Sequence, residues 1–241
     1  MTVLWLPELS TDPGWFPAPA SALAEPDGLL AFGGDLSPQR LTAAYHQGIF
    51  PWFSEDDPLL WWSPAIRAVF EPGSLNAGRS LCKDWQKHQY HFSCDLAFAE
   101  VVAGCAAPRP NQPGTWISAE IRAAYQQLHH QGIAHSIEVW LQDELVGGLY
   151  GLQIGHLFCG ESMFNRVPNA AKLALVQLQQ YLQSFDLGWI DCQLPNPFLL
   201  QCGAQKMPRP DYLQLLHALA ASAVPAELWQ AGPLPALIKN R

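Results

Sequence analysis

The stretch from Ala134 to Gln193 constrains the fold more than any other part of the chain. Apolar and polar residues alternate there with a period of two, and turn residues interrupt the alternation twice. This pattern predicts a meander of three strands over residues 137–141, 145–152 and 156–163. Apolar residues then recur at helical spacing over 169–184, which predicts a helix lying on the sheet with one face. A short strand over 189–192 completes the unit.

Three polar side chains occupy this unit where apolar ones are expected: Glu161, Asp191 and Gln193. A carboxylate inside an apolar strand is costly unless it is paired, hydrogen-bonded or functional. We expect Glu161 and Asp191 to be the only carboxylates embedded in the strands, and together they predict an acidic pocket. Gln193 shares the face of Asp191 if the strand continues. The alternative is a structural hydrogen-bonding pair of carboxylates, with Gln193 as a polar strand end.

Composition narrows the class of protein. Hydrophobic residues make up 49% of the 241 residues and charged residues 14%, which is typical of a globular chain. The formal net charge of −8 argues against nucleic-acid binding driven by overall charge. The six cysteines include no CxxC pair, and the eight histidines show no ligand-like spacing, so we expect free thiols and no metal. The chain begins without a signal-like segment and has no apolar run of ~20 residues, so we expect a cytoplasmic protein.

The order of the other elements predicts an α+β fold. Ser37 and Pro38 are typical of a helix start, with Gly48 just past its end. Residues 1–64 are rich in proline, glycine and tryptophan, and we expect them to form a small irregular domain before a larger one over 65–241. Further helices are predicted over 95–105, with Asp95 as its N-cap, and over 118–131 and 211–222. The proline-interrupted tail is expected to lie along the surface.

A basic face is predicted near the start of the larger domain. Arg79, Lys83 and Lys87 are spaced four residues apart, so a helix would align them on one side. Such a face is most often simply solvated. The alternative is contact with the phosphates of an RNA.

Long motifs along the chain resemble leucyl/phenylalanyl-tRNA–protein transferases. They are FPAPASALAEPDGLLAFGGDLSPQRLTAAYHQGIFPWF, LWWSP, TWI, AYQQLHHQGIAHSIEVW, LVGGLYGLQIGHLFCGESMF and IDCQ. The resemblance covers about residues 15–212. It implies a small N-terminal domain joined to a GNAT-like acyltransferase domain. It also implies transfer of Leu or Phe from aminoacyl-tRNA to the N-terminal Arg or Lys of a protein, which marks that protein for degradation by the N-end rule.

The resemblance also implies roles for individual residues. GESMF and DCQ would surround the basic N-terminus of the acceptor, with Asp191, Gln193 and Glu161 as the reacting-site polar groups. Trp52 and Trp116 would lie near the 3′-terminal adenosine of the tRNA, where stacking of a base on an aromatic ring is worth about 1–3 kcal/mol. The pocket for the Leu or Phe side chain would be lined by Leu149, Phe158, Leu178 and Ile190 or their neighbours. Core packing is the alternative for each of these aromatic and apolar residues.

The implied reaction is aminolysis of an ester that is already activated. An α-amino group titrates at about 7.7–8.0, so freeing its lone pair near neutral pH costs on the order of 1 kcal/mol. Positioning the amine against the ester carbonyl contributes up to ~7–11 kcal/mol, so we expect a site that mainly orients its substrates. We expect it to need neither a cofactor nor a metal. We also expect the protein to be a monomer. One alternative is an acyl-CoA-dependent N-acyltransferase, although MFNRVPNAAKLAL lacks the glycines that hold a pyrophosphate. Another is a tryptophan-rich binder of carbohydrate or peptide, which leaves the carboxylates unexplained.

Overall fold

The computed structural model describes residues 5–54, 56–75, 77–108 and 115–236. Within these residues the chain forms two sheets and seven α-helices, with a 3-10 turn at Pro19–Ser21. The α+β class is therefore confirmed, with a mixed sheet at its centre. None of the helices in this part of the chain has both the length and the apolar character that crossing a membrane requires.

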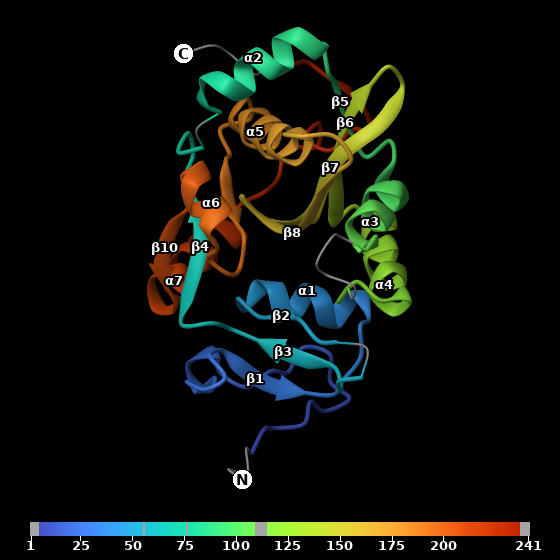
Figure 1. The fold of residues 1–241 in the computed structure, drawn as a ribbon. Coiled ribbons are helices and arrows are strands. Elements are labelled where there is room, and N and C mark those ends of the chain that lie inside the picture. The colour runs from blue at the N-terminus through green and yellow to red at the C-terminus, as the bar shows by residue number, and fades with distance from the viewer. Residues whose placement is uncertain (1–4, 55, 76, 109–114, 237–241) are drawn as a thin grey trace.

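The small sheet lies at one end of the molecule (Figure 1). Its three antiparallel strands have the order β1-β3-β2. They are β1 (Leu29–Phe32), β2 (Phe50–Pro51) and β3 (Leu60–Trp62). Helix α1 (Pro38–His46) lies between this sheet and the rest of the molecule. It begins as expected, because the Ser37 side chain accepts a hydrogen bond from the Arg40 amide and Pro38 opens the first turn.

The large sheet has eight strands in the order β10-β4-β9-β8-β7-β6-β5-β11. They are β4 (Ile66–Phe70), β5 (His91–Cys94), β6 (Ala134–Leu141), β7 (Glu144–Ile154), β8 (Leu157–Asn165), β9 (Trp189–Asp191), β10 (Gln205–Pro208) and β11 (Gly232–Leu234). The predicted meander is confirmed as β6-β7-β8, which is antiparallel throughout. Every pair in this sheet is antiparallel except β8 and β9, which are parallel because helix α5 connects them.

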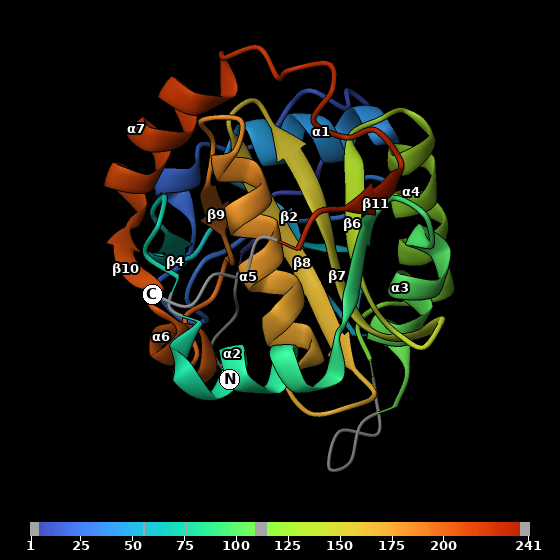
Figure 2. The same cartoon turned by 90° about the horizontal axis from the view of Figure 1, so that it is seen from above.

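Helices cover both faces of the large sheet. They are α2 (Gly78–His88), α3 (Phe98–Ala106), α4 (Ala119–His130), α5 (Ala170–Gln183), α6 (Pro197–Cys202) and α7 (Arg209–Ala220). Figure 2 shows α5 lying across the strands, with α3 and α4 together on one side of the molecule. Two clusters of buried apolar residues follow from this layering. One includes α1, α3 and α4, and the other lies under α2 and α5.

The start of α3 differs from the prediction. Asp95 is not its N-cap: the helix begins at Phe98, and Ala97 occupies the cap position without a side-chain hydrogen bond. The Asp95 carboxylate instead accepts hydrogen bonds from the neighbouring strand β6, including one from the Ser136 amide at 2.8 Å. Helix α4 lies within the predicted range 118–131, and Ser118 is its N-cap, since the Ser118 side chain accepts a hydrogen bond from the Ile121 amide.

The tail also differs from the prediction, because it belongs to the sheet instead of lying on the surface. Residues 232–234 form edge strand β11, paired with β5, and Leu228 is fully buried. The Tyr181 hydroxyl on α5 donates a hydrogen bond of 2.6 Å to the Leu228 carbonyl. The tail is rich in proline and shows no alternation of apolar and polar residues, so its sequence did not indicate a strand. The strand forms by pairing with β5, which is far away along the chain.

The two predicted domains share a core. Trp61 of the small sheet and Leu152 of the large sheet belong to one cluster of buried apolar residues. The sequence passes from one sheet to the other between Trp62 and Ile66. The division at residue 64 lies inside this connection and stays a prediction.

Candidate active site

A cavity of about 200 Å³ opens where β8 and β9 separate. The two strands pair only as far as Cys159 and Asp191. Beyond that point β8 continues to Asn165, paired with β7 on its other edge. Side chains from β7, β8, β9, α5 and α6 surround the resulting gap. The apolar part of its wall consists of Leu149, Met163, Leu175, Leu178, Ile190 and Leu199. The polar side chains at its edge include Glu161, Ser162, Gln193 and Asn196.

A β-bulge in β8 directs Glu161 to this cavity. Tyr150 of β7 pairs with Ser162 and the next residue, Gly151, pairs with Gly160, so Glu161 is the extra residue between them. A bulge re-aims a side chain and increases local twist. It explains how a strand that is otherwise apolar presents a carboxylate beside the opening.

Three donors hold the Glu161 carboxylate. The Tyr45 hydroxyl on α1 donates to Oε1 at 2.6 Å, and the Tyr125 hydroxyl on α4 donates to Oε2 at 2.8 Å. The Gln193 side-chain amide also donates to Oε1, at 2.9 Å. Burial nevertheless raises the pKa of Glu161 to about 7, against the lowering effect of the tyrosine hydrogen bonds. Glu161 is therefore close to half ionised at neutral pH.

Gln193 reaches Glu161 by a route that the sequence analysis did not predict. Strand β9 ends at Asp191, and Gln193 has φ 52°, in the left-handed region, so the strand does not continue as expected. The Gln193 amide donates a hydrogen bond of 2.9 Å to Asp191 Oδ1 while its side chain bonds Glu161. Gln193 thus connects two carboxylates that have no direct hydrogen bond in the described residues.

Asp191 has a different environment from the one expected. It is fully buried, and its carboxylate forms an ion pair with Arg67 of β4. The Tyr212 hydroxyl on α7 donates to the same carboxylate at 2.8 Å. The charge of Asp191 raises the pKa of Arg67, which outweighs the effect of burial. Arg67 and Tyr212 bind the Asp191 carboxylate, and Asp191 is not part of the cavity wall, whereas Glu161 is.

A third carboxylate is embedded in the sheet, so the expectation that Glu161 and Asp191 are the only ones was wrong. Glu138 of β6 is fully buried and accepts hydrogen bonds from the hydroxyls of Ser93 and Ser136. Burial raises its pKa. The signal in the sequence was the same as for Glu161, a carboxylate within an apolar strand.

The predicted apolar wall is only partly reproduced. Leu149, Leu178 and Ile190 line the cavity. Phe158 does not: it is fully buried, and its ring lies 5.7 Å from that of Trp229 in the tail.

The two tryptophans predicted to lie near a nucleotide are outside this wall. Trp52 is 42% exposed, and its ring makes an edge-to-face contact with Trp62 at 5.5 Å. Trp116 is half-buried against the core that contains α1 and α4. The loop just before it, residues 109–114, lies outside the described residues. Stacking of either ring on a base stays a prediction.

The three cations of the predicted basic face lie on one helix. Arg79, Lys83 and Lys87 all lie on α2 and are exposed. Helix α2 lies beside α5, at the end of the molecule opposite the small sheet (Figure 1). Their contact with RNA phosphates stays a prediction.

Four residues of the site were missed. Tyr45 and Tyr125 lie on helix faces, where a tyrosine counts as apolar in a periodicity argument. Arg67 and Tyr212 bind Asp191 across 124 and 21 residues of sequence, so spacing could not pair them. A lone arginine within the apolar run of β4 was the available signal.

The chain is similar to known proteins over most of its length. Residues 69–217 match the sequence profile of the leucyl/phenylalanyl-tRNA protein transferase family, and residues 34–65 match the profile of that family's N-terminal domain. A leucyl/phenylalanyl-tRNA–protein transferase of Shewanella pealeana is 55% identical over 215 residues, which is 89% of this chain and 91% of that protein. Those of Shewanella frigidimarina and Shewanella halifaxensis are 54% and 52% identical, covering 89% and 92% of this chain and 91% and 94% of those proteins.

Similarity to solved structures is much weaker. The L-PGS structure from Bacillus licheniformis has a TM-score of 0.39 at 10% identity, over 70% of this chain and 54% of that one. The C-terminal DUF2156 domain of a putative lysylphosphatidylglycerol synthetase from Agrobacterium fabrum has a TM-score of 0.36 at 12% identity, over 69% and 56%. The sequence matches, however, cover Tyr45, Tyr125, Glu161 and Gln193, and they identify this chain as a member of the leucyl/phenylalanyl-tRNA–protein transferase family.

Proposed function

We propose that the cavity between β8 and β9 holds the Leu or Phe side chain of an aminoacyl-tRNA, and that Glu161 receives the α-amino group of the acceptor at its edge. The observation that carries this proposal is the position of Glu161, a carboxylate with a pKa of about 7 beside an apolar cavity. A volume of about 200 Å³ is on the scale of one large apolar side chain. The carboxylate stands where an amine would meet the ester.

The chemistry needs one bond formed and one broken. An ionised Glu161 binds the ammonium form and takes its first proton, which frees the lone pair. The acceptor nitrogen then attacks the ester carbonyl, and a second proton from the nitrogen passes to the departing tRNA 3′-oxygen, so that an amide and a free 3′-hydroxyl result. Its pKa lies within about one unit of the 7.7–8.0 of an α-amino group, so the transfer costs on the order of 1 kcal/mol.

The other polar groups orient this carboxylate in the proposal. Gln193 donates to Glu161 and is itself fixed by Asp191, so Asp191 acts as a positioning residue. Arg67 and Tyr212 fix Asp191 in turn. Glu161, not Asp191, takes the proton in this proposal, because the Asp191 carboxylate is paired with the Arg67 guanidinium.

Acceptors with an N-terminal Arg or Lys fit a site that contains one carboxylate at the edge of the cavity and another held behind it. Cytoplasmic location, a monomeric state and a role in the N-end rule are proposed with them. We also propose that residues 65–241 form a GNAT-like domain, supported by a mixed sheet whose one parallel pair separates to form the cavity. The acyl-CoA alternative is not favoured, since the turn before α5 contains Pro168 and no glycine.

Mass spectrometry of an acceptor peptide tests the proposal. A peptide beginning with Arg is incubated with the protein and either Leu-tRNA, Phe-tRNA or acetyl-CoA. The expected product carries one added Leu or Phe residue, and Glu161→Gln reduces it while the same peptide with a blocked α-amino group gives none. An acetylated peptide, or transfer by Glu161→Gln at the wild-type rate, would contradict it.

A further inference from the structure

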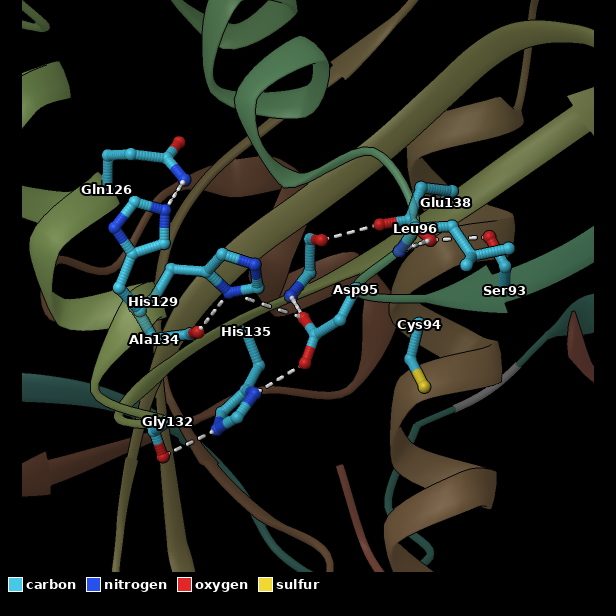
Figure 3. Close-up of polar contacts among 12 residues, drawn as sticks. Ser93, Cys94, Asp95, Leu96, Gln126, His129, Gly132, Ala134, His135 and Glu138 are labelled. Carbon is cyan, nitrogen blue, oxygen red and sulfur yellow. Dashed lines mark hydrogen bonds and ion pairs between the residues drawn. The ribbon is translucent and has the colours of Figure 1, made fainter. Parts of the chain in front are cut away.

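A second cluster of polar side chains lies away from the cavity. Asp95 follows β5, His129 is in the last turn of α4, and His135 is in β6. Their side chains are only 6%, 20% and 5% exposed. One nitrogen or oxygen atom from each lies within 4.8 Å of the other two. Figure 3 shows both imidazole rings turned toward the Asp95 carboxylate.

Short contacts define how these atoms are arranged. His135 Nδ1 lies 2.7 Å from Asp95 Oδ2, and His135 Nε2 lies 3.1 Å from the Gly132 carbonyl oxygen. His129 Nδ1 lies 3.9 Å from Asp95 Oδ1 and 2.9 Å from the Ala134 carbonyl oxygen. The Nδ1 atoms of His129 and His135 therefore both face the Asp95 carboxylate, in the space between α4, β5 and β6.

The two rings are held in place by stacking. The His129 ring stacks on Phe98 at 4.2 Å with an interplanar angle of 1°, and the His135 ring stacks on Trp229 at 4.3 Å and 6°. Asp95 has φ 56°, and its Oδ1 accepts from the Ser136 amide at 2.8 Å. All three side chains are thus ordered before any ligand arrives, which lowers the entropic cost of binding one.

The cluster also has an unbalanced charge. The buried carboxylate of Glu138 lies in the same corner, where it and Asp95 act on one another electrostatically. In the described part of the chain, the ion-pair partners of Asp95 are His129 and His135, and neither Asp95 nor Glu138 forms an ion pair with a lysine or arginine. A bound cation would offset both carboxylates.

We propose that Asp95, His129 and His135 form a binding site for a divalent transition-metal ion of the zinc type, with the Ala134 carbonyl oxygen beside them as a fourth ligand. Imidazole nitrogens and carboxylate oxygens are ligands that such ions prefer. The Gly132 carbonyl accepts the outer N–H of His135, which is the usual support for a metal-bound histidine. Binding requires that each imidazole present an unprotonated nitrogen to the metal.

The sequence hides this site because its ligands are not spaced as in a motif. Asp95 lies on another strand, and the two histidines are separated by the turn between α4 and β6. His129 lies one helical turn after Tyr125, which holds Glu161. The metal would therefore join the end of α4 to β5 and β6, a structural role separate from the transfer reaction.

Titration of the full chain with Zn²⁺ and Co²⁺, followed by calorimetry and absorption, tests the site. The wild type is expected to bind one equivalent. Asp95→Asn, which retains an acceptor for the Ser136 amide, and His129→Phe, which retains an aromatic ring against Phe98, should each weaken binding by more than about 100-fold, since even outer-shell partners are worth about 10–100-fold. His217→Ala, which removes an exposed histidine on α7, is the matched control and should bind like the wild type.

Three results would overturn the proposal: no saturable binding by the wild type, binding by both ligand variants as tight as that of the wild type, or a Co²⁺ spectrum dominated by thiolate bands. The last would assign the metal to cysteine side chains instead. Circular dichroism and thermal melting without metal check that each variant folds. If Asp95→Asn melts early, His129→Phe alone decides between a metal site and a purely hydrogen-bonded cluster.

Discussion

Glu161 and Asp191 lie on neighbouring strands of one sheet, and the protein balances their charges in different ways. Asp191 is matched by the full positive charge of Arg67. In the described part of the chain, the side chains that hold Glu161 are neutral donors, two tyrosine hydroxyls and one amide. These donors compensate the burial of Glu161 incompletely, and its pKa rises to about 7.

This difference fits the two proposed roles: Asp191 supports the geometry of the site, and Glu161 takes part in the reaction. An ion pair that is fully buried keeps its geometry and is strongly disturbed when one partner is lost. A carboxylate that titrates near neutral pH can bind a cation and accept its proton. Gln193 contacts both, so the rigid pair fixes the orientation of the titratable one.

The largest expected effect is on stability and comes from Asp191→Asn. The change leaves the Arg67 charge buried without its partner, which costs about 3–5 kcal/mol. For a chain of this length that lowers the melting temperature by about 6–20 °C. Thermal and urea unfolding measure it. Arg67→Met combined with Asp191→Leu should recover most of the loss, and a single variant as stable as the wild type would contradict the assignment.

Glu161→Gln is expected to behave in the opposite way, keeping the fold and losing activity. The amide preserves the shape of the side chain and an acceptor for the tyrosines, but it cannot take a proton. We expect transfer to fall by about 100-fold or more, the lower end of the range for a lost general base. Peptide transfer rates measure it. The acid limb near pH 7 should stay fixed when the acceptor's amine pKa is changed, and should disappear in Glu161→Gln. A limb that moves with the acceptor would instead return the titration to the substrate.

The pH dependence of stability gives an independent measurement of the same carboxyl. Its pKa rises from 4.5 to about 7 on folding, so between these values the folded state binds more protons than the unfolded state. Stability due to this group is therefore full below pH 4.5, falls as pH rises to about 7, and is level above it. Urea unfolding of the wild type minus that of Glu161→Gln should show this slope. A difference that is flat over pH 4.5–7 would contradict the raised pKa.

The same contrast shows what the sequence can predict. Helix α1 with its cap, helix α4 and the meander were predicted because caps, helical periodicity and alternation are local. Strand β11 and the site of Asp95 were not, since each depends on pairing with distant residues. Glu161 and Gln193 were found as polar residues in an apolar unit. Their environment was not, because Tyr45 and Arg67 reach the site from elements 116 and 124 residues away from their partners.

The smallest expected effect distinguishes the two networks directly. Tyr45→Phe or Tyr125→Phe removes one donor to Glu161, whereas Tyr212→Phe removes one donor to Asp191. A hydrogen bond to a charged group is worth about 1.5–3 kcal/mol, so each of the first two variants should raise the pKa of Glu161 by about one to two units. The rate at pH 7 should then drop by about 5- to 50-fold and recover at higher pH.

Tyr212→Phe is the matched control for that shift. It removes a hydroxyl of the same kind, buried in the same core, and it should lower stability without moving the acid limb of the rate profile. The profile of transfer rate against pH, recorded for the wild type and the three variants, measures the outcome. If Tyr212→Phe moved the limb as far as Tyr125→Phe, the two carboxylates would titrate as one unit. Arg67 would then govern the charge of Glu161 as well as that of Asp191, and the separation between support and chemistry would fail.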